Sequence, residues 1–365
     1  MLRVLQVLDK ISVDSGASIV VMNYYRALDH RQLTFDFMLN EEPSAEIRSF
    51  IESNGSKIFI MPALKAGNTS KYIKALKAFY KQHDYKIIHG HVANSAVFYL
   101  GIARNRAKRK SAQHRIIHSH NTRSSDNFIK RIRNFVLTRF IKNVATNYMA
   151  CSKAAADFLF GKRRSAVILN NAIDIEKFAY SAAKRESSRN SLSVGDKKII
   201  GHIGRFSAQK NHKFLIDLFY ELTKINKNVL LLLIGGGELH GDIKKTVREK
   251  GIEDKVIFTG VVDNAHEYLS AMDVFVLPSL FEGLPMTGVE AQINGVPCIF
   301  SDAVTKETKI SDNTAFLPID RTGLWVDEIN RMLGVGRIEN KDIQTDQFNI
   351  NIQVKKLTSY YEELL

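Results

Sequence analysis

The sequence predicts an α/β protein of two domains, each with a parallel β-sheet covered by helices. The chain has 365 residues, of which 45% are apolar, and this is enough for two cores of ordinary size. Short apolar runs alternate with helical patterns along the whole chain, as βαβ units require. A polar passage at residues 174–196 separates two such series, and we place the hinge between the domains there.

The strands are predicted from short apolar runs separated by polar and turn residues. In the first series we expect strands at Val4–Leu8, Phe35–Leu39, Lys57–Ile60, Ile87–His89, Arg115–His118, Tyr148–Ala150 and Val167–Leu169. In the second series we expect strands at Ile199–Ile203, Val229–Ile234, Val256–Thr259, Val274–Leu277, Cys298–Phe300 and Ala315–Leu317. We therefore place one domain at residues 1–175 and the other at residues 176–345. Residues 346–365 form a C-terminal helix, with an apolar face at Ile350, Val354, Leu357 and Tyr361.

Composition predicts a cytoplasmic protein. The chain has no stretch of 18 uninterrupted apolar residues, and its first residues, MLRVLQVLDK, are typical of a strand rather than of a signal peptide. The two cysteines, Cys151 and Cys298, lie in apolar surroundings far apart in the sequence. This argues against a disulfide framework and suits a reducing compartment. We expect both thiols to be packed and not nucleophilic.

The net charge of +14 is concentrated in the first domain. Residues 1–175 hold 28 Lys and Arg against 12 Asp and Glu, whereas residues 176–365 hold 24 against 26. The positive residues gather at Arg104, Arg106, Lys108, Arg109 and Lys110, and again at Lys130, Arg131, Arg133, Arg139 and Lys142. Apolar residues interleave with the second group, which predicts a basic amphipathic helix at residues 128–142.

Three environments suit such a helix, namely anionic lipid, solvent alone and nucleic acid. We favour anionic lipid, and therefore a peripheral position on the inner face of the cell membrane. We expect no nucleic-acid partner, because aromatic side chains for base stacking do not interleave with the basic residues.

Residues 281–302, FEGLPMTGVEAQINGVPCIFSD, are the most informative segment of the chain. They follow a predicted buried strand and place Glu282 and Glu290 around a Gly-Leu-Pro turn. Pro285 suits the first helical position, so we expect Glu282 in the loop and Glu290 about a turn and a half into a helix. The unpaired N–H groups and partial positive charge of a helix N-terminus bind phosphate, and the two acids can accept from sugar hydroxyls beside it. The alternative is an ordinary helix start, where the dipole alone favours acids.

A second constellation follows the predicted strand that ends at Ile203. In the segment GRFSAQKNH, Arg205 and Lys210 stand in a loop that leads into a helix near Asn211. A guanidinium for bidentate phosphate contact and an ammonium point charge suit a diphosphate that leaves with negative charge. The segment lacks the Gly-Lys-Ser/Thr of a Walker A loop. The three glycines at residues 235–237 indicate close backbone approach rather than a dinucleotide-binding loop.

The first domain contributes Gly16 and two His-x-His pairs. Gly16 lacks a Cβ atom and lets a bound group approach the backbone. His89 with His91, and His118 with His120, each end a predicted strand, and alternation places both members of a pair on one face, where they could bind a metal. Since no acidic pair or cysteine accompanies them, we expect no metal and no other cofactor. We expect instead that one histidine of each pair lines the cleft.

In their order and spacing, these segments resemble the retaining nucleotide-sugar glycosyltransferases of family 4, which have the GT-B fold. The likeness is greatest to the branch that builds bacterial capsule, exopolysaccharide and related lipid-linked polymers. It is carried by the Gly16 loop, IIHGH, RIIHSHN, ACSKAA, VILNNAID, GRFSAQKNH, LLLIGGGEL, VIFTG and the Glu-x7-Glu segment followed by NGVPCIFSD. The resemblance implies two Rossmann-like domains facing across a cleft, with the acceptor on the first and the nucleotide sugar on the second. It also implies that the C-terminal helix crosses back to the first domain.

The resemblance further implies a role for each site residue. Arg205 and Lys210 would hold the donor diphosphate, Glu290 would bind the nucleotide ribose, and Glu282 would contact the donor sugar. His120 would lie near the transferred sugar. The remaining donor contacts would come from backbone near the phosphate, at Gly16, Gly204, Leu284, Pro285, Met286 and Thr287.

The chain departs from the family pattern at Ser15 and Ser18, where relatives often have a second glycine and an acid or amide. The departure concerns how tightly the first loop closes on the donor.

We therefore predict a retaining glycosyltransferase that moves a sugar from a nucleotide-sugar donor to a lipid-linked saccharide acceptor in bacterial surface polysaccharide synthesis. Because one scaffold serves several reactions, a nucleotide-sugar epimerase or a phosphorylase stays open. A non-catalytic basic protein that binds lipid or nucleic acid is the alternative of another class. The presence of Arg205, Lys210, Glu282 and Glu290 together argues against it.

Overall fold

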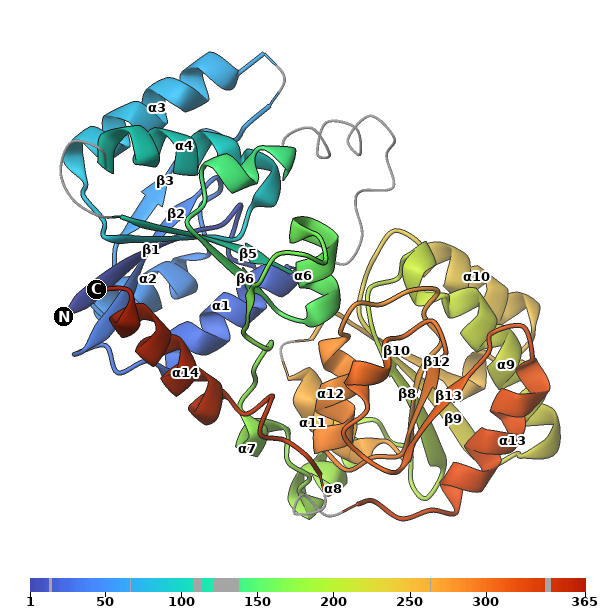
Figure 1. The fold of residues 1–365 in the computed structure, drawn as a ribbon. Helices are drawn as coiled ribbons and strands as arrows, with labels where there is room; N and C mark the ends of the chain where they lie inside the picture. The colour runs from blue at the N-terminus through green and yellow to red at the C-terminus, as the bar shows by residue number, and fades with distance from the viewer. Residues whose placement is uncertain (13–14, 66, 108–112, 121–137, 263, 339–342) are drawn as a thin grey trace. The chain divides into compact units, whose positions relative to one another are not determined.

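The chain forms two compact units, each built around one parallel sheet (Figure 1). The computed structural model describes the chain except for residues 13–14, 66, 108–112, 121–137, 263 and 339–342. Unit 1 comprises Met1–Asp174 and Gln347–Leu365, and unit 2 comprises Ile175–Asp346. The limits expected from the sequence, after residues 175 and 345, each differ from these by one residue.

The sheet of unit 1 has seven strands in the order β3-β2-β1-β4-β5-β6-β7. All neighbouring pairs are parallel. The order reverses between β1 and β4, which is the place where open parallel sheets bind ligands, at the carboxyl ends of the strands. The strands are β1 (Leu2–Val7), β2 (Leu33–Leu39), β3 (Ile58–Ile60), β4 (Ile87–Gly90), β5 (His114–Ser119), β6 (Asn147–Ala150) and β7 (Val167–Ile168).

Helices pack on both faces of this sheet, because neighbouring residues of a strand point to opposite faces. Along β1, Val4 belongs to one apolar cluster and Leu5 to another. The first cluster includes residues of α1 (Gly16–Ala27), α2 (Ala45–Ser53) and α14 (Ile350–Glu363), and the second includes residues of α3 (Thr69–Gln82) and α4 (Ala96–Ala107). The short helix α6 (Lys153–Phe160) packs against β6.

Helix α14 ends the chain and belongs to unit 1. The segment before it pairs with Ile173, whose N–H donates to the Phe348 carbonyl at 2.9 Å and whose carbonyl accepts from the Ile350 N–H at 3.0 Å. The four residues of its expected apolar face are buried: Ile350, Val354, Leu357 and Tyr361. Burial of this stripe holds the helix against α1.

The sheet of unit 2 has six parallel strands in the order β10-β9-β8-β11-β12-β13. Its order reverses between β8 and β11. The strands are β8 (Lys198–Ile203), β9 (Val229–Ile234), β10 (Val256–Gly260), β11 (Val274–Leu277), β12 (Cys298–Ser301) and β13 (Thr314–Leu317). Every strand predicted from the sequence is therefore present, each in the sheet of its own unit.

Two apolar clusters also flank the sheet of unit 2. One contains residues of α9 (His212–Ile225), α10 (His240–Glu249) and α13 (Thr322–Leu333), and the other contains residues of α11 (Ala265–Ala271) and α12 (Met286–Ile293). Two further helices, α7 (Ile175–Phe178) and α8 (Ala182–Ser191), open the unit. Both Cys151 and Cys298 are buried and neither forms a disulfide within the described residues, and burial raises the pKa of Cys298 well above its usual value, which confirms that they are packed thiols.

The predicted basic helix falls largely on residues 121–137, so its Lys130, Arg131 and Arg133 lie outside the described residues. Lys142 is not in a continuous helix, because a turn at residue 140 precedes the 3₁₀ turn Ile141–Asn143 that contains it. In the first basic group, Lys108, Arg109 and Lys110 also lie outside the described residues. In the part of the chain that the structure describes, no helix is both long and apolar enough to cross a membrane.

Candidate active site

The central site residues of unit 2 meet where its strand order reverses. Strands β8 and β11 are parallel neighbours, so the loops that follow them leave the same edge of the sheet. The Leu280 N–H donates to the Gln209 carbonyl at 2.8 Å, and the Gln209 side-chain amide donates to the Phe281 carbonyl at 3.0 Å. These bonds hold the two loops together, and bring Lys210 to Glu282.

Lys210 and Glu282 form an ion pair at this edge. The Lys210 Nζ atom lies 2.6 Å from Glu282 Oε1, and the Ser279 hydroxyl donates to the same oxygen at 2.9 Å. The side chains are only 16% and 9% exposed, so solvent screens the pair less than it would a surface pair. An ammonium has three donors, and one is used here. The site therefore presents a positive group with a fixed position and donors left for a ligand.

Arg205, in contrast, is an exposed residue. Its guanidinium contacts Glu238 at 3.2 Å, and the two side chains are 67% and 55% exposed. The backbone N–H of Glu238 itself and the Arg205 charge hold the pKa of Glu238 below its usual value. Exposed pairs of this kind contribute roughly 0–1 kcal/mol. The guanidinium can therefore exchange Glu238 for a bound anion at little cost.

The glycines after β9 fix the loop that carries Arg205. A Cβ atom on Gly235, whose φ is +138°, would lie 2.2 Å from the Gly204 carbonyl oxygen. A Cβ atom on Gly237, whose φ is +151°, would lie 2.6 Å from the Phe206 carbonyl oxygen. The prediction of close backbone approach is confirmed, and the approach is between two loops of the same unit. Gly204 likewise leaves room for Lys210, whose Cδ atom would be 3.3 Å from a Cβ atom there.

Helix α12 starts one residue later than predicted. Pro285 has φ −71° and ψ 108°, which is extended backbone, and it occupies the N-cap position rather than the first helical position. Its carbonyl accepts from the Gly288 N–H at 3.0 Å, and no side chain caps the helix. The Thr287 hydroxyl is buried without a hydrogen-bond partner in the described residues. Leu284 and Met286 are the residues on either side of Pro285. Because no side chain caps the helix, its N-terminus keeps the positive partial charge that favours an anion.

Glu290 lies in the second turn of α12. Burial raises the pKa of its carboxyl group to about 7, although the positive charge of Lys177 in α7 opposes the shift. At neutral pH the group is therefore present in both its protonated and ionised forms. In either form it can accept a hydrogen bond from a hydroxyl group. It lies in the same helix as Thr287, one turn from its N-terminus.

A second group of polar side chains lies at the carboxyl edge of the unit 1 sheet, where strands β4 and β5 are neighbours. The rings of His89 and His91 stack with centroids 4.4 Å apart, and those of His118 and His120 with centroids 4.1 Å apart. Burial lowers the pKa of His120 to about 4 and that of His89 to about 3. Both pairs thus share one face, as predicted, and their rings are neutral near pH 7.

The positions and hydrogen bonds of the histidine ring nitrogens show how well this cluster would suit a metal ion. Within the described residues, His89, His91 and His118 offer nitrogens that all lie within 4.8 Å of one another. However, both ring nitrogens of His89 and of His91 already take part in hydrogen bonds, which a metal would have to replace. The arrangement fits a hydrogen-bonded cluster better than a ligand set.

Gly16 begins α1, and a Cβ atom at this position would have no other atom within 4 Å. Its φ is not positive either, so neither packing nor backbone conformation requires glycine here. The Ser15 side chain makes no capping hydrogen bond, whereas the buried Ser18 hydroxyl donates to the Lys10 carbonyl. At Ser18, where the chain departs from the family pattern, the side chain therefore forms a hydrogen bond to the backbone at Lys10.

Sequence reasoning missed Ser279, Glu238, Gln6 and Tyr361. Ser279 is two residues beyond the end of β11 and three residues before the predicted site residue Glu282, and this spacing could have indicated their contact. Gln6 is an amide within the apolar run Val4–Leu8, which could have marked it as a buried polar partner. Glu238 and Tyr361 gave no such signal.

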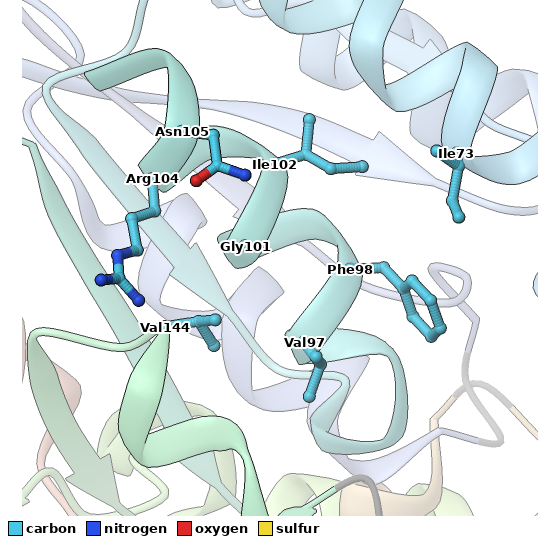
Figure 2. A pocket seen from close by; sticks show the side chains of 8 residues that line it. All are labelled: Ile73, Val97, Phe98, Gly101, Ile102, Arg104, Asn105 and Val144. Atoms are coloured by element: carbon cyan, nitrogen blue, oxygen red, sulfur yellow. The ribbon is translucent and has the colours of Figure 1, made fainter. Parts of the chain in front are cut away.

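A pocket of about 270 Å³, lined by both apolar and polar side chains, lies beside helices α3 and α4 (Figure 2). Ile73, Val97, Phe98 and Ile102 supply much of its apolar lining, and Arg104 and Asn105 are its polar members. The Arg104 guanidinium donates to the Asn143 carbonyl at 2.5 Å. Sequence reasoning did not identify this pocket.

Comparisons with known proteins identify the family. Residues 183–333 match the family described as glycosyl transferases group 1. The glycosyltransferase-family protein EpsF of Bacillus subtilis (strain 168) is 33% identical over 353 residues, which is 94% of this chain and 90% of EpsF.

Two other relatives are more distant. The UDP-Gal:alpha-D-GlcNAc-diphosphoundecaprenol alpha-1,3-galactosyltransferase of Escherichia coli is 24% identical, over 79% of this chain and 76% of its own. The capsular polysaccharide biosynthesis glycosyltransferase CapH of Staphylococcus aureus is 24% identical, over 99% of each chain.

The fold is also that of solved structures. The crystal structure of Anabaena HepE in complex with UDP and glucose superposes with a TM-score of 0.80 over the whole of both chains, at 15% identity. The two Rossmann-like units thus have the GT-B fold that the sequence predicted. With Lys210 and Glu282 paired at the strand-order reversal of unit 2 and a close relative matched over nearly its full length, the chain belongs to the glycosyl transferases group 1 family and is a glycosyltransferase.

Proposed function

We propose that the protein transfers a sugar from a nucleotide-sugar donor to a lipid-linked saccharide in the synthesis of a bacterial surface polysaccharide, with retention of anomeric configuration and without a bound metal. The observation that carries the proposal is the Lys210–Glu282 pair at the carboxyl edge between β8 and β11. A positive group at a strand-order reversal, near a helix N-terminus without a side-chain cap, suits a diphosphate.

In this proposal the bond between the anomeric carbon and the diphosphate oxygen breaks, and its electron pair stays on that oxygen. Lys210, Arg205 and the N-terminus of α12 stabilise the developing negative charge. The acceptor hydroxyl forms the new bond to the anomeric carbon, and its proton goes to the released nucleoside diphosphate or to solvent. Cationic side chains and a helix dipole are sufficient for the leaving group, so no step needs a metal.

The acids have separate roles. Glu282 uses Oε1 to hold both Lys210 and Ser279, so its other oxygen is the one we assign to a hydroxyl of the donor sugar. Glu290, further along α12, accepts from the ribose. The names of the Escherichia coli relative and of the HepE complex contain UDP, which makes a UDP-sugar the first donor to test.

The acceptor is assigned to unit 1. The excess of basic residues in the first 175 residues suits a phosphate-bearing lipid carrier at the inner face of the membrane. The pocket beside α3 and α4 has apolar side chains for part of a prenyl chain and Arg104 for a nearby phosphate (Figure 2). The Escherichia coli relative, by its name, acts on a diphosphoundecaprenol-linked sugar.

Turnover of the full chain tests the reaction. We expect a UDP-, GDP- or ADP-sugar to raise the melting temperature, because a ligand that binds the folded state stabilises it. Release of nucleotide should then require a prenyl-diphosphate-linked sugar, persist in EDTA, and give a product whose anomeric configuration matches the donor. Conversion of the donor without any acceptor would indicate an epimerase, and dependence on inorganic phosphate would indicate a phosphorylase. An inverted product would refute retention.

Vesicle flotation tests the membrane assignment separately. We expect binding to anionic vesicles and little binding to neutral ones, with a loss in a double variant Arg139→Gln/Lys142→Gln. Lys245→Gln, an exposed lysine on α10 of unit 2, is the matched control. Equal binding to both kinds of vesicle would rule out the role of charge.

A further inference from the structure

Six side chains from four elements form one hydrogen-bonded chain at the strand-order reversal of unit 1. Gln6 comes from β1, His89 and His91 from the end of β4, and Tyr361 from α14. The two ends of the chain are the stacked rings of His118 and His120, at the end of β5. The middle member, Gln6, is 1% exposed.

One arm runs from Gln6 through Tyr361. The Gln6 amide Nε2 donates to the Tyr361 hydroxyl at 3.2 Å, and that hydroxyl lies 2.5 Å from His89 Nδ1. His89 Nε2 in turn lies 3.2 Å from His118 Nδ1.

The other arm runs from Gln6 through His91. His91 Nε2 lies 2.8 Å from the Gln6 Oε1 atom, and His91 Nδ1 lies 2.8 Å from His120 Nε2. One amide group therefore touches both arms, with its acceptor on one and its donor on the other.

All four rings are neutral, because burial lowers the pKa of each of them. A neutral imidazole has one N–H donor and one acceptor nitrogen. A ring that donates at one nitrogen must therefore accept at the other. Along a chain of such rings, the direction of the first hydrogen bond therefore sets the direction of every hydrogen bond that follows.

The Gln6 amide oxygen can only accept, so His91 carries its hydrogen on Nε2 and accepts at Nδ1. His120 then donates from Nε2, which leaves its Nδ1 as an acceptor. The Gln6 amide nitrogen can only donate, so the Tyr361 hydroxyl accepts from it. In the described residues the other hydrogen-bond partner of this buried hydroxyl is His89 Nδ1, so the hydroxyl donates its hydrogen there rather than leave it unpaired.

His89 then donates from Nε2 to His118 Nδ1, and His118 carries its hydrogen on Nε2. The two terminal atoms, His118 Nε2 and His120 Nδ1, are buried and have no hydrogen-bond partner among the described residues. One is a donor and the other an acceptor, on adjacent rings.

We propose that Gln6 and Tyr361 are positioning residues that fix all four histidines in the Nε2–H tautomer, so that His118 presents a donor and His120 an acceptor to hydroxyl groups of a sugar substrate. A hydroxyl group both donates and accepts, and one hydroxyl or a neighbouring pair satisfies both atoms. The ligand class rests on the proposed function, whereas the tautomers do not.

Nitrogen NMR of the ¹⁵N-histidine-labelled full chain tests the tautomers without substrate. In the wild type we expect all four rings to carry hydrogen on Nε2. In Tyr361→Phe the His89 arm loses its hydroxyl, so His89 and His118 should populate both tautomers while His91 and His120 keep theirs. Tyr24→Phe is the matched control, because Tyr24 is buried in the same core and its hydroxyl donates to the Asn170 carbonyl at 2.7 Å.

A second variant acts on the middle of the chain. In Gln6→Glu, measured at a pH above the pKa of the introduced carboxyl group, the ionised carboxylate accepts from both arms. The Tyr361 hydroxyl then donates to the carboxylate instead of to His89, so only His89 and His118 should carry their hydrogen on Nδ1. We expect Tyr361→Phe to lower kcat/KM about tenfold, the effect of one hydrogen bond, and Tyr24→Phe to leave it unchanged.

Hydrogen on Nδ1 of all four rings in the wild type, or equal tautomer changes in Tyr24→Phe and Tyr361→Phe, would overturn the inference. Should the expected tautomers be found while no sugar nucleotide is turned over, the proposed function fails and the positioning role of Gln6 and Tyr361 remains.

Discussion

The two polar groups of the molecule occupy equivalent places in two similar sheets, yet they differ in charge. In unit 2 the Lys210–Glu282 ion pair lies at the strand-order reversal, and the exposed Arg205 follows β8. In unit 1 the same topological place holds neutral histidine rings linked through Gln6. The difference shows that the strand-order reversal of a parallel sheet can carry charged side chains that suit a charged ligand group, or neutral side chains that suit hydroxyl groups. Which of these it suits depends on a few side chains at the carboxyl ends of the strands.

The largest expected effect comes from removing the charge of unit 2. Lys210→Ala should lower kcat by about 10²–10³, the range found when one group that stabilises developing charge is removed. The control is Lys213→Ala, an exposed lysine at the start of α9, which should retain activity. Steady-state kinetics and circular dichroism separate loss of chemistry from loss of fold. Normal turnover in Lys210→Ala would contradict the assignment of the diphosphate site.

Two buried groups, His120 in unit 1 and Glu290 in unit 2, should contribute to the pH dependence of stability with opposite signs, although burial also lowers the pKa values of His202 and His212 in unit 2. The folded state keeps His120 neutral, with its pKa near 4, so the unfolded chain binds more protons below pH 6.5. Unit 1 should therefore lose up to about 3 kcal/mol through His120 as the pH falls from 6.5 towards 4. The folded state of unit 2 instead holds a proton on Glu290 that the unfolded chain releases between pH 4.5 and about 7. Through Glu290 alone, unit 2 should lose about 3 kcal/mol as the pH rises through that range.

Hydrogen exchange of the full chain at pH 5 and pH 7.5, corrected for intrinsic exchange rates, reports the two units separately. Glu290→Gln should make the stability of unit 2 rise more steeply with pH, because His202 and His212 then act unopposed by Glu290, and should leave the slope of unit 1 unchanged. Glu249→Gln, an exposed acid on α10, serves as the control. An unchanged slope of unit 2 in Glu290→Gln would break the comparison.

The smallest expected effect on stability comes from Arg205. Because its ion pair with Glu238 is exposed, Arg205→Ala should change the free energy of unfolding by less than about 0.5 kcal/mol in urea denaturation. Its effect on activity should still be a clear loss of kcat, since the guanidinium is proposed to contact the leaving diphosphate. A large loss of stability would mean that Arg205 is a structural residue.

Much of the fold could be predicted because the strands are local features of the sequence. The run VLLLLI at Val229–Ile234 is apolar throughout and is buried along its length, as a strand covered on both faces should be. The start of α12 was misplaced by one residue, because Pro285 is tolerated both at the first helical position and just before it. The predicted site residues Lys210 and Glu282 are real neighbours, but their ion pair could not be foreseen from residues 72 apart in the sequence.

The sequence by itself determined the alternation of strands and helices, the number of sheets and the kinds of side chain at the strand ends. These follow from hydrophobic periodicity and turn residues, which act over a few positions. Only the tertiary structure decided the partners, such as Gln6 with Tyr361, which are 355 residues apart. The physical reason is that hydrogen bonds and ion pairs depend on which strands become neighbours and on how deeply their ends are buried. Both are properties of the whole packed unit rather than of any local segment.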